Sequence, residues 1–322
     1  MPGITGAGTT YNLPNYTGEL FSASPEDTPF LSAIGGLTGG KAVNSQIIQW
    51  QGYQLRDVDT SRQRVEGAAA PTADTRARFS VTNALEIHQE IVEVSYSRQA
   101  ATGFVTTDGA PVVSVGNSKI PADELAWQVD TQLKQIARDV DASFITGTYQ
   151  LPTDGTKPRK TRGLLNAITT NKVTSTRTAA QMTQDDVLDI MQKVYEQGGI
   201  QESGTRTIIV GAQMKRALSK AFVDAAHPAT VVRNVGGVNL QVLDTDFGQC
   251  NIMLDRYVPN NTLLVVSLEQ CVPCFLEIPG KGTFFAEPLA KTGATDRVQV
   301  YGEIGLQYGA EASHGVLTMK AV

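Results

Sequence analysis

The chain has 322 residues, of which 27 are Lys or Arg and 32 are Asp or Glu, giving a formal net charge of −5 and a charged fraction of only 18%. No apolar run approaches the roughly 20 residues that span a bilayer, residues 1–25 carry no secretory signal, and a net acidic chain is not expected to wrap duplex DNA. Three cysteines are too few for a disulfide framework, so we expect a globular protein of a reducing compartment, without a membrane partner. The low charge indicates either that much of the surface is neutral and polar or that much of it is buried against partners.

The N-terminal stretch and the segment after it differ in composition. Residues 1–40 are rich in Gly and Pro and follow neither a helical nor a strand period, which predicts an arm that needs a surface to lie on. Residues 43–97 contain two strand-like runs, Ile47–Leu55 and Phe79–Tyr96, around a tip of small residues at Glu66–Asp74. Because two strands alone are only marginally stable in water, a long hairpin of this kind predicts a neighbouring molecule beneath it. An ordinary meander inside a sheet is an equally good interpretation of the composition.

Charged side chains of both signs flank and include this tip, and they are candidates for contacts with the neighbouring molecule. They are Arg56, Asp57, Asp59, Arg62, Arg64, Glu66, Asp74, Arg76 and Arg78.

The clearest helix of the sequence is predicted over residues 121–146. Pro121 is favoured in a first turn, and Asp123 and Glu124 there complement the helix dipole. Apolar residues three or four positions apart then form one stripe, and Gly147 can end the helix. The stripe consists of Leu125, Val129, Leu133, Ile136, Val140 and Phe144.

The rest of the chain alternates helical and strand patterns. A loop is predicted over 149–177, where basic residues concentrate; a solvated loop is favoured over a DNA contact. A capping pattern at Thr183 and Asp186 starts a second helix, which Gly198-Gly199 ends. The apolar side of this helix is predicted to consist of Val187, Ile190, Met191 and Val194. A third helix is predicted at 213–223, and Gly236-Gly237 indicates a hairpin over 231–243. Strands are predicted at Arg206–Val210, Cys250–Leu254, Thr262–Val266, Cys271–Leu276, Phe284–Ala286, Val298–Tyr308 and Val316–Met319, so the body is of the α+β class.

Two segments have the spacing of chemical motifs. Gly35 to Lys41 nearly matches a phosphate-binding loop, but Ala42 has no hydroxyl and no amphipathic helix follows, so we interpret it as an elbow between arm and hairpin. Cys271 and Cys274 have redox or metal spacing, but they lie in a strand-like run and are interpreted as small buried hydrophobes.

Other titratable residues form no catalytic pattern. His88, His227 and His314 are scattered, without a nucleophile motif nearby. Glu86, Glu90 and Glu93 are interpreted as solvated charges on a strand. We therefore expect no catalytic residue, no cofactor and no metal, and a protein that is not an enzyme.

Several short strings stand along the chain in a set order. They are Thr28-Pro29-Phe30-Leu31, Glu66-Gly67, Ala122-Asp123-Glu124-Leu125-Ala126, Arg162-Gly163-Leu164, Tyr195 with Gly198-Gly199, and Val300-Tyr301-Gly302-Glu303. With the order arm, hairpin, isolated helix and α+β body, they resemble the tailed-bacteriophage major capsid protein of the Hong Kong 97 type over essentially the whole chain.

The resemblance implies a domain organisation. It comprises an N-terminal arm at 1–40, an extended hairpin loop at 41–100, a peripheral domain at 101–180 with the spine helix at 121–146, an axial α/β domain at 181–280, and a return to the peripheral domain at 281–322.

The same resemblance implies a function without catalysis. Such proteins assemble with themselves as hexamers and pentamers of an icosahedral shell around double-stranded DNA. The arm and the hairpin charges are then expected to contact neighbouring subunits. The implied location is the virion, after assembly in the host cytoplasm. The implied partners are a scaffolding protein, a portal, a cementing protein, and packaged DNA in loose contact.

Two departures from the type member refine these expectations. In the type member a lysine of the extended loop bonds covalently to a neighbour, whereas no lysine lies between Lys41 and Lys119, so we expect a shell without crosslinks. No long helical segment precedes the arm, so we expect the scaffold to be a separate protein.

Three alternatives remain open at this stage. The first is an encapsulin-like nanocompartment shell of the same fold, which encloses enzymes instead of a genome. The second is an enzyme that uses Cys271 and Cys274 or the Gly35–Lys41 loop. The third is a fibre or surface-array protein.

Overall fold

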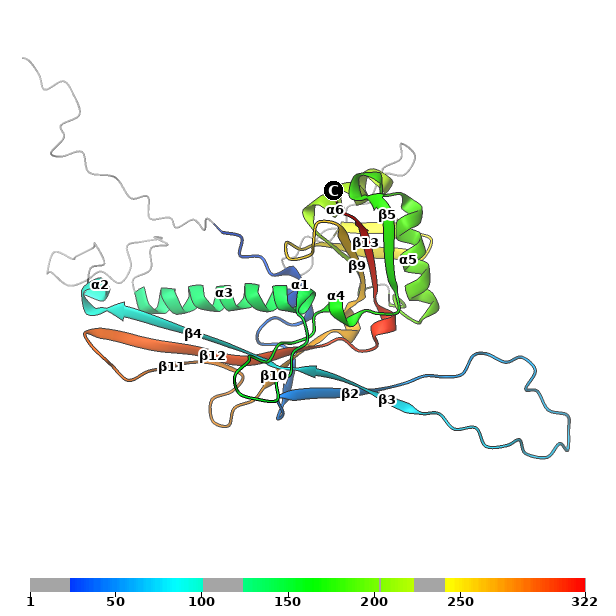
Figure 1. Cartoon of the computed structure of the whole chain (residues 1–322), viewed down its shortest axis with the longest axis horizontal. Coiled ribbons are helices and arrows are strands. Elements are labelled where there is room, and N and C mark those ends of the chain that lie inside the picture. The colour runs from blue at the N-terminus through cyan, green and yellow to red at the C-terminus, as the bar shows by residue number, and fades with distance from the viewer. Residues whose placement is uncertain (1–23, 101–123, 203, 223–240, 322) are drawn as a thin grey trace, which may run out of the picture. The chain divides into compact units, whose positions relative to one another are not determined.

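The computed structural model describes residues 24–100, 124–202, 204–222 and 241–321 (Figure 1). The chain divides into two units. The smaller consists of Met1–Glu26, Glu90–Lys134 and Ala286–Val300. The larger consists of Asp27–Gln89, Gln135–Phe285 and Tyr301–Val322. Parts of several predicted features lie outside the described residues. They are residues 1–23 of the predicted arm, the predicted helix start at 121–123, His227, and most of the predicted hairpin at 231–243.

A six-stranded mixed sheet forms the centre of the larger unit. Its order is β5-β13-β9-β6-β8-β7, with β9 antiparallel to both β13 and β6, and β6 parallel to β8. The central strand β9 is buried along its whole length, which its run of Leu and Val residues permits. The strand bounds are β5 Lys172–Thr178, β6 Arg206–Val210, β7 Gln241–Thr245, β8 Gly248–Leu254, β9 Thr262–Ser267 and β13 Gly315–Lys320.

Two amphipathic helices, α5 (Gln184–Glu196) and α6 (Ala212–Phe222), complete this core. α5 packs against β5, β9 and β13. Its apolar face is fully buried, as the sequence pattern predicted, and consists of Val187, Ile190, Met191 and Val194. Gly198 takes a φ of +82° two residues after α5 ends, a conformation that glycine adopts without steric cost.

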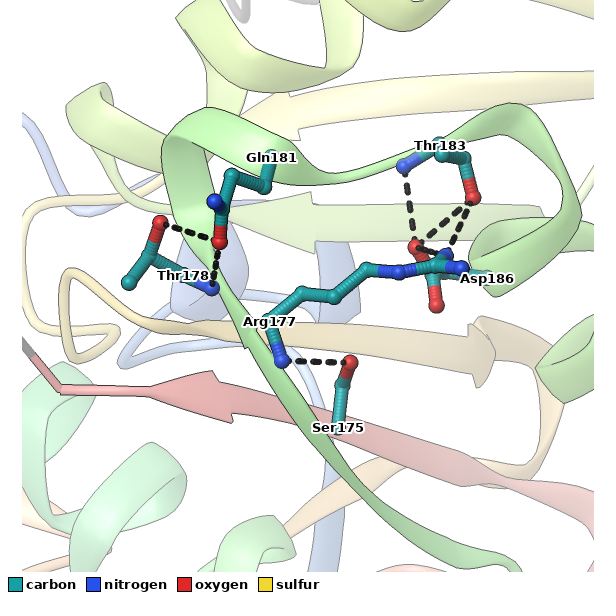
Figure 2. A network of polar contacts seen from close by, with 6 residues as sticks. All are labelled: Ser175, Arg177, Thr178, Gln181, Thr183 and Asp186. Atoms are coloured by element: carbon teal, nitrogen blue, oxygen red, sulfur yellow. Dashed lines mark hydrogen bonds and ion pairs between the residues drawn. The ribbon is translucent and has the colours of Figure 1, made fainter.

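The start of α5 is fixed by a polar network (Figure 2). The Thr183 N–H and hydroxyl both donate to the Asp186 carboxylate, at 2.9 and 2.8 Å, so the predicted capping box is confirmed. Arg177, at the end of β5, donates to the Thr183 hydroxyl at 3.0 Å and to Asp186 at 3.1 Å. Burial alone would raise the pKa of Asp186, but the hydrogen bonds from Thr183 and Arg177 lower it overall. The network therefore joins the sheet edge to the helix that covers it.

β5 is a correction to the predicted loop over 149–177. It pairs in parallel with β13, so residues 172–178 are strand. Lys172, Thr174 and Arg177 make it polar, and its exposure alternates as expected for an edge strand, with one face solvated. The short helix α4 (Leu164–Ala167) also lies in the predicted loop.

A second sheet has the order β1-β10-β12-β11, with β4 also paired to β12. In the larger unit, β1 runs parallel to β10, and β10 pairs antiparallel with the C-terminal part of β12. The bounds are β1 Lys41–Val43, β4 Glu86–Ser95, β10 Val272–Leu276, β11 Phe284–Pro288 and β12 Thr295–Gln307.

A separate two-stranded ribbon consists of β2 (Ile47–Tyr53) and β3 (Arg78–Ala84), and Figure 1 shows the connecting chain as a wide loop. Their antiparallel register pairs Ile47 with Ala84 and Tyr53 with Arg78. The predicted strand Phe79–Tyr96 is thus two strands. The chain breaks pairing at the fully buried Leu85, and β4 then pairs with β12 instead of lengthening the ribbon.

The long helix α3 spans Glu124–Thr146, and the short helix α1 spans Pro29–Ile34. Within the smaller unit, the described part of α3 carries Glu124, which pairs with Arg98 of α2 (Tyr96–Ala100) at 2.9 Å. The described residues also include 3₁₀ turns at Ala179–Gln181, Leu268–Gln270 and Glu311–Ser313.

The range expected for the axial domain, 181–280, contains only part of the six-stranded sheet. β5 precedes this range and β13 follows it, yet both pair within the sheet. The sheet is completed by hydrogen bonds between strands distant in sequence, which a division along the chain cannot detect.

Candidate interaction surface

The three thiols are buried and free. Burial raises the pKa of Cys250 and of Cys274 to about 11 each, and it also raises that of Cys271. A thiol that stays protonated at neutral pH is neither a nucleophile nor a ready metal ligand. The interpretation of Cys271 and Cys274 as buried hydrophobes therefore agrees with the structure.

The Gly35–Lys41 segment has no phosphate-binding geometry, because strand β1, not a helix, follows it. The Lys41 ammonium donates to the Gln307 side chain at 3.2 Å. Gly40 has a φ of +159°, and a Cβ there would meet the Pro273 carbonyl oxygen at 2.4 Å. The segment is thus a close-packed turn against β10, more constrained than the expected elbow.

His314 is a structural residue of the core. It is fully buried, its Nε2 lies 2.7 Å from the Tyr308 carbonyl oxygen, and its Nδ1 accepts from the Ser267 N–H at 3.3 Å. These partners require the neutral ring with a proton on Nε2, and burial lowers its pKa accordingly.

Glu86 is a correction to the interpretation of Glu86, Glu90 and Glu93 as solvated charges. It is buried, lies 3.0 Å from His88 Nε2, and accepts from the Thr161 N–H at 3.2 Å. The charge is tolerated inside because both of its oxygens are paired.

All nine charged residues of the ribbon and its loop are exposed, together with every other residue from 53 to 80. Asp74 accepts from Arg76 at 2.6 Å and from Arg62 at 3.5 Å, which lowers the pKa of Asp74. Asp59 bonds only to nearby Ser61, at 2.6 Å, which lowers its pKa. These are local contacts between solvated side chains, and such pairs contribute little to stability.

Large apolar side chains share this exposed surface. Val58 is 93% exposed, Val65 79%, and Tyr53 and Leu55 each 71%. Apolar side chains this exposed are not stabilised by burial within their own subunit, and clusters of such side chains mark interaction sites. We call residues 53–80 the ribbon surface.

The base of the ribbon is anchored by residues that the sequence analysis did not select. Trp50 donates from its ring nitrogen to the Gly309 carbonyl at 2.7 Å, and its ring meets Tyr308 edge to face at 4.9 Å. Asn83 is fully buried; its amide donates to the Leu306 carbonyl at 2.7 Å and its oxygen accepts from the Arg162 N–H at 2.7 Å. In the sequence, the only sign of this anchor was Trp50, a large aromatic residue within a predicted strand. Contacts within the subunit therefore hold the ribbon at its base, whereas residues 53–80 are exposed to solvent.

The basic residues of 157–177 are less available than expected for a solvated loop. Arg159 pairs with the buried Glu303 at 2.7 Å. Arg162 lies over the Tyr149 ring and reaches the Tyr308 hydroxyl, and Arg177 belongs to the network at α5. Lys157 and Lys172 are exposed.

The predicted stripe of α3 is buried unevenly. Ile136, Val140 and Phe144 are at most 1% exposed, whereas Leu125, Val129 and Leu133 are half-buried. Asp141, on the same helix, is fully buried, and the sequence analysis did not identify it. A charged residue beside the stripe gives no sign of burial when its partners lie elsewhere in the chain.

Neither a metal centre nor a membrane span occurs in the part of the chain that the structure describes. No three His, Cys, Asp or Glu side chains gather there as metal ligands would. No described helix has the length and hydropathy required to cross a bilayer.

Comparison with known proteins gives one family and one fold. The model of the SU10 major capsid protein family matches residues 3–321, whereas no curated protein matches the chain. The capsid asymmetric unit of cyanophage A-1(L) aligns over 97% of this chain and 98% of its own, with a TM-score of 0.63 and 9% identity. The capsid of the native GTA particle covers 97% and 96%, with a TM-score of 0.61 and 14% identity. The holo-SrpI encapsulin complex from Synechococcus elongatus covers 96% and 92%, with a TM-score of 0.56 and 14% identity.

Proposed function

The chain belongs to the SU10 major capsid protein family and has the Hong Kong 97-type fold, and from this premise we propose that it builds an icosahedral shell of hexamers and pentamers around double-stranded DNA. The family is a structural one, and membership means that the chain is a capsid subunit that associates with copies of itself. Beyond this, we propose the hexamers and pentamers, the icosahedral form of the shell and the double-stranded DNA inside it.

The observation that carries the proposal is the ribbon surface. A strand pair whose connecting loop carries large exposed apolar groups, and which is anchored at its base, gains energy by covering another molecule. In a shell, that molecule is the adjacent subunit. Obligate interfaces of about 2,000 Å² or more per contact are expected, and closed symmetry multiplies individually modest contacts.

The charges of the ribbon surface set the register of this contact. All nine charged residues of this surface are exposed, so they can reach charged groups across an interface; they are Arg56, Asp57, Asp59, Arg62, Arg64, Glu66, Asp74, Arg76 and Arg78. Charged groups at an interface contribute to specificity more than to affinity.

The domain organisation follows the same premise. Residues 1–40 act as the arm, 41–100 as the extended loop and 101–180 with α3 as the peripheral domain. Residues 181–280 form the axial domain, which β5 and β13 extend, and the remainder of 281–322 returns to the peripheral domain.

Packaged DNA is proposed to make loose contact with the shell. The net charge of −5 lets DNA move past the inner wall without adhering to it. Most arginines of 157–177 already have protein partners, which supports loose contact rather than a DNA-binding site.

Other partners belong to the assembly pathway. A scaffolding protein, a portal and a cementing protein would act with the subunit in the host cytoplasm, where the shell that becomes part of the virion is assembled. We propose no catalytic activity, since the three buried thiols and the Gly35–Lys41 turn offer no reactive group.

The nearest alternative is an encapsulin-like compartment, which the structural likeness to the SrpI encapsulin keeps open. Both readings share the fold and differ in what the shell contains. The family match over residues 3–321 favours the capsid.

Electron microscopy of the expressed chain, and of particles from infected cells treated with nuclease, tests this function. We expect closed shells in both cases and nuclease-resistant DNA inside the second. Planar arrays or filaments, or shells that hold protein cargo and no nucleic acid, would contradict the proposal.

The mature shell is expected to hold together without covalent bonds between subunits. No lysine lies in the ribbon surface or anywhere between Lys41 and Lys119, so this segment has no side-chain amine with which to form an isopeptide bond. Denaturing electrophoresis of mature particles should give one band at the monomer mass. A ladder of oligomers that resists boiling and reductant would show that a lysine elsewhere forms the bond.

A further inference from the structure

Two buried carboxyl groups, which we call the carboxyl pair, lie against the start of α1. Asp141 comes from α3 and is fully buried, and Asp255 directly follows β8 and is 1% exposed. The two carboxyl groups lie close enough to influence each other's ionisation. The Oδ2 atom of each has no hydrogen-bond partner among the described groups.

The carboxyl pair caps α1 from outside the helix. The first backbone N–H groups of a helix have no partner within it, and the Thr28 side chain does not supply one here. Instead the Leu31 N–H donates to Asp141 Oδ1 at 2.6 Å, and the Phe30 N–H lies near Asp255. Phe30 and Leu31 are themselves buried. One acid pair thus joins α1 to α3 and to the end of β8.

The charged groups around the carboxyl pair do not neutralise it. Asp27, before α1, is exposed and pairs with Arg256 at 2.9 Å, so this cation is already used. On α3, Arg138 donates to the Tyr257 hydroxyl at 3.2 Å, and the Tyr257 N–H donates to Asp255 at 2.8 Å. The negative charge of Asp27 opposes a second charge on the pair.

Two adjacent carboxylates cannot both be ionised away from water without a cation. Burial, and then the charge of Asp255, raise the pKa of Asp141 to about 8; burial also raises that of Asp255. A proton held between the two oxygens removes the repulsion and supplies the missing donor. The remaining oxygens then accept from backbone N–H groups, Asp141 Oδ1 from Leu31 of α1 and Asp255 Oδ1 from Tyr257.

We propose that Asp141 and Asp255 share one proton and so act as a pH-dependent latch for α1, which holds the helix at acidic and neutral pH and releases it when the proton is lost. The direction follows from linkage. The latched form binds one more proton than the released form from about pH 4 to about pH 8. The latch is therefore strongest below that range and weakens as pH rises through it.

Hydrogen exchange of the full chain tests the latch directly. The peptide covering Pro29–Ile34 is followed between about pH 5 and 9, with rates corrected for the intrinsic pH dependence of exchange. Its opening constant should increase by up to about tenfold per pH unit and level off above about pH 8. Reference amides in β6 and β9 should not follow the same course.

Substitutions within and beside the carboxyl pair separate the latch from general instability. Asp141→Asn keeps an oxygen for the Leu31 N–H and places a permanent donor beside Asp255, so the pH dependence should disappear while protection remains. Asp255→Asn should do the same and serves if the first variant folds poorly. Asp27→Asn, a matched change at an exposed carboxylate outside the pair, should keep the wild-type slope.

A wild-type opening constant that is flat from pH 5 to 8 would overturn the proposal. So would an unchanged slope in both Asn variants, or β6 and β9 opening in parallel with α1, since that would be unfolding of the whole unit. The proposal does not depend on shell assembly, because exchange is measured on the chain itself.

Discussion

Replacing residues 54–77 with Asn-Gly should leave the subunit folded and abolish shell assembly. Tyr53 and Arg78 are directly paired in the ribbon, so a two-residue turn can join them without changing the register. Every deleted residue is exposed, so no core contact of the subunit is lost. What is lost is the outer part of the ribbon surface, which we propose covers the neighbouring subunit.

Sedimentation and electron microscopy measure the assembly of this variant, and thermal unfolding measures its fold. We expect an unchanged unfolding midpoint for dispersed subunits and no closed particles, a loss of at least about a hundredfold in assembled mass, since cooperative shells amplify each lost contact. Deletion of residues 153–156, another exposed loop, is the matched control and should assemble normally. Shells of normal size from the ribbon deletion would disprove the role given to this surface.

Local patterns sufficed where an element is determined by its own residues. α5 was predicted from the Thr183–Asp186 cap and an apolar stripe that is buried as expected. β6 has the predicted bounds, because a run of Ile and Val with this length is a buried strand in any sheet that accepts it.

Features that depend on distant partners could not be predicted. β5 is polar, and it is a strand because β13, more than 130 residues later, pairs with it. Nothing near Asp141 in the sequence indicates its burial, because Leu31, which donates a hydrogen bond to it, lies 110 residues earlier. Glu86 is buried for the same reason, with Thr161 as its partner. The nine charged residues of the ribbon surface are exposed, and the interface role predicted for them depends on a second subunit.

The uneven burial of the α3 stripe leads to the second large effect. Phe144→Ala should lower the free energy of unfolding by about 3–5 kcal/mol, the range for a phenylalanine removed from a closely packed core. Phe144 is completely buried. Alanine is the best helix former, so the loss measures packing and not helix propensity. Denaturant unfolding of dispersed subunits gives the number.

A valine pair from the same stripe provides the internal control. Val140 is fully buried and Val129 is only half-buried, although the sequence pattern treats them alike. Val140→Ala should destabilise the chain clearly, whereas Val129→Ala should be much closer to neutral, because the gain in helix propensity offsets part of a smaller packing loss. Equal losses at the two positions would mean that the stripe is one uniform core.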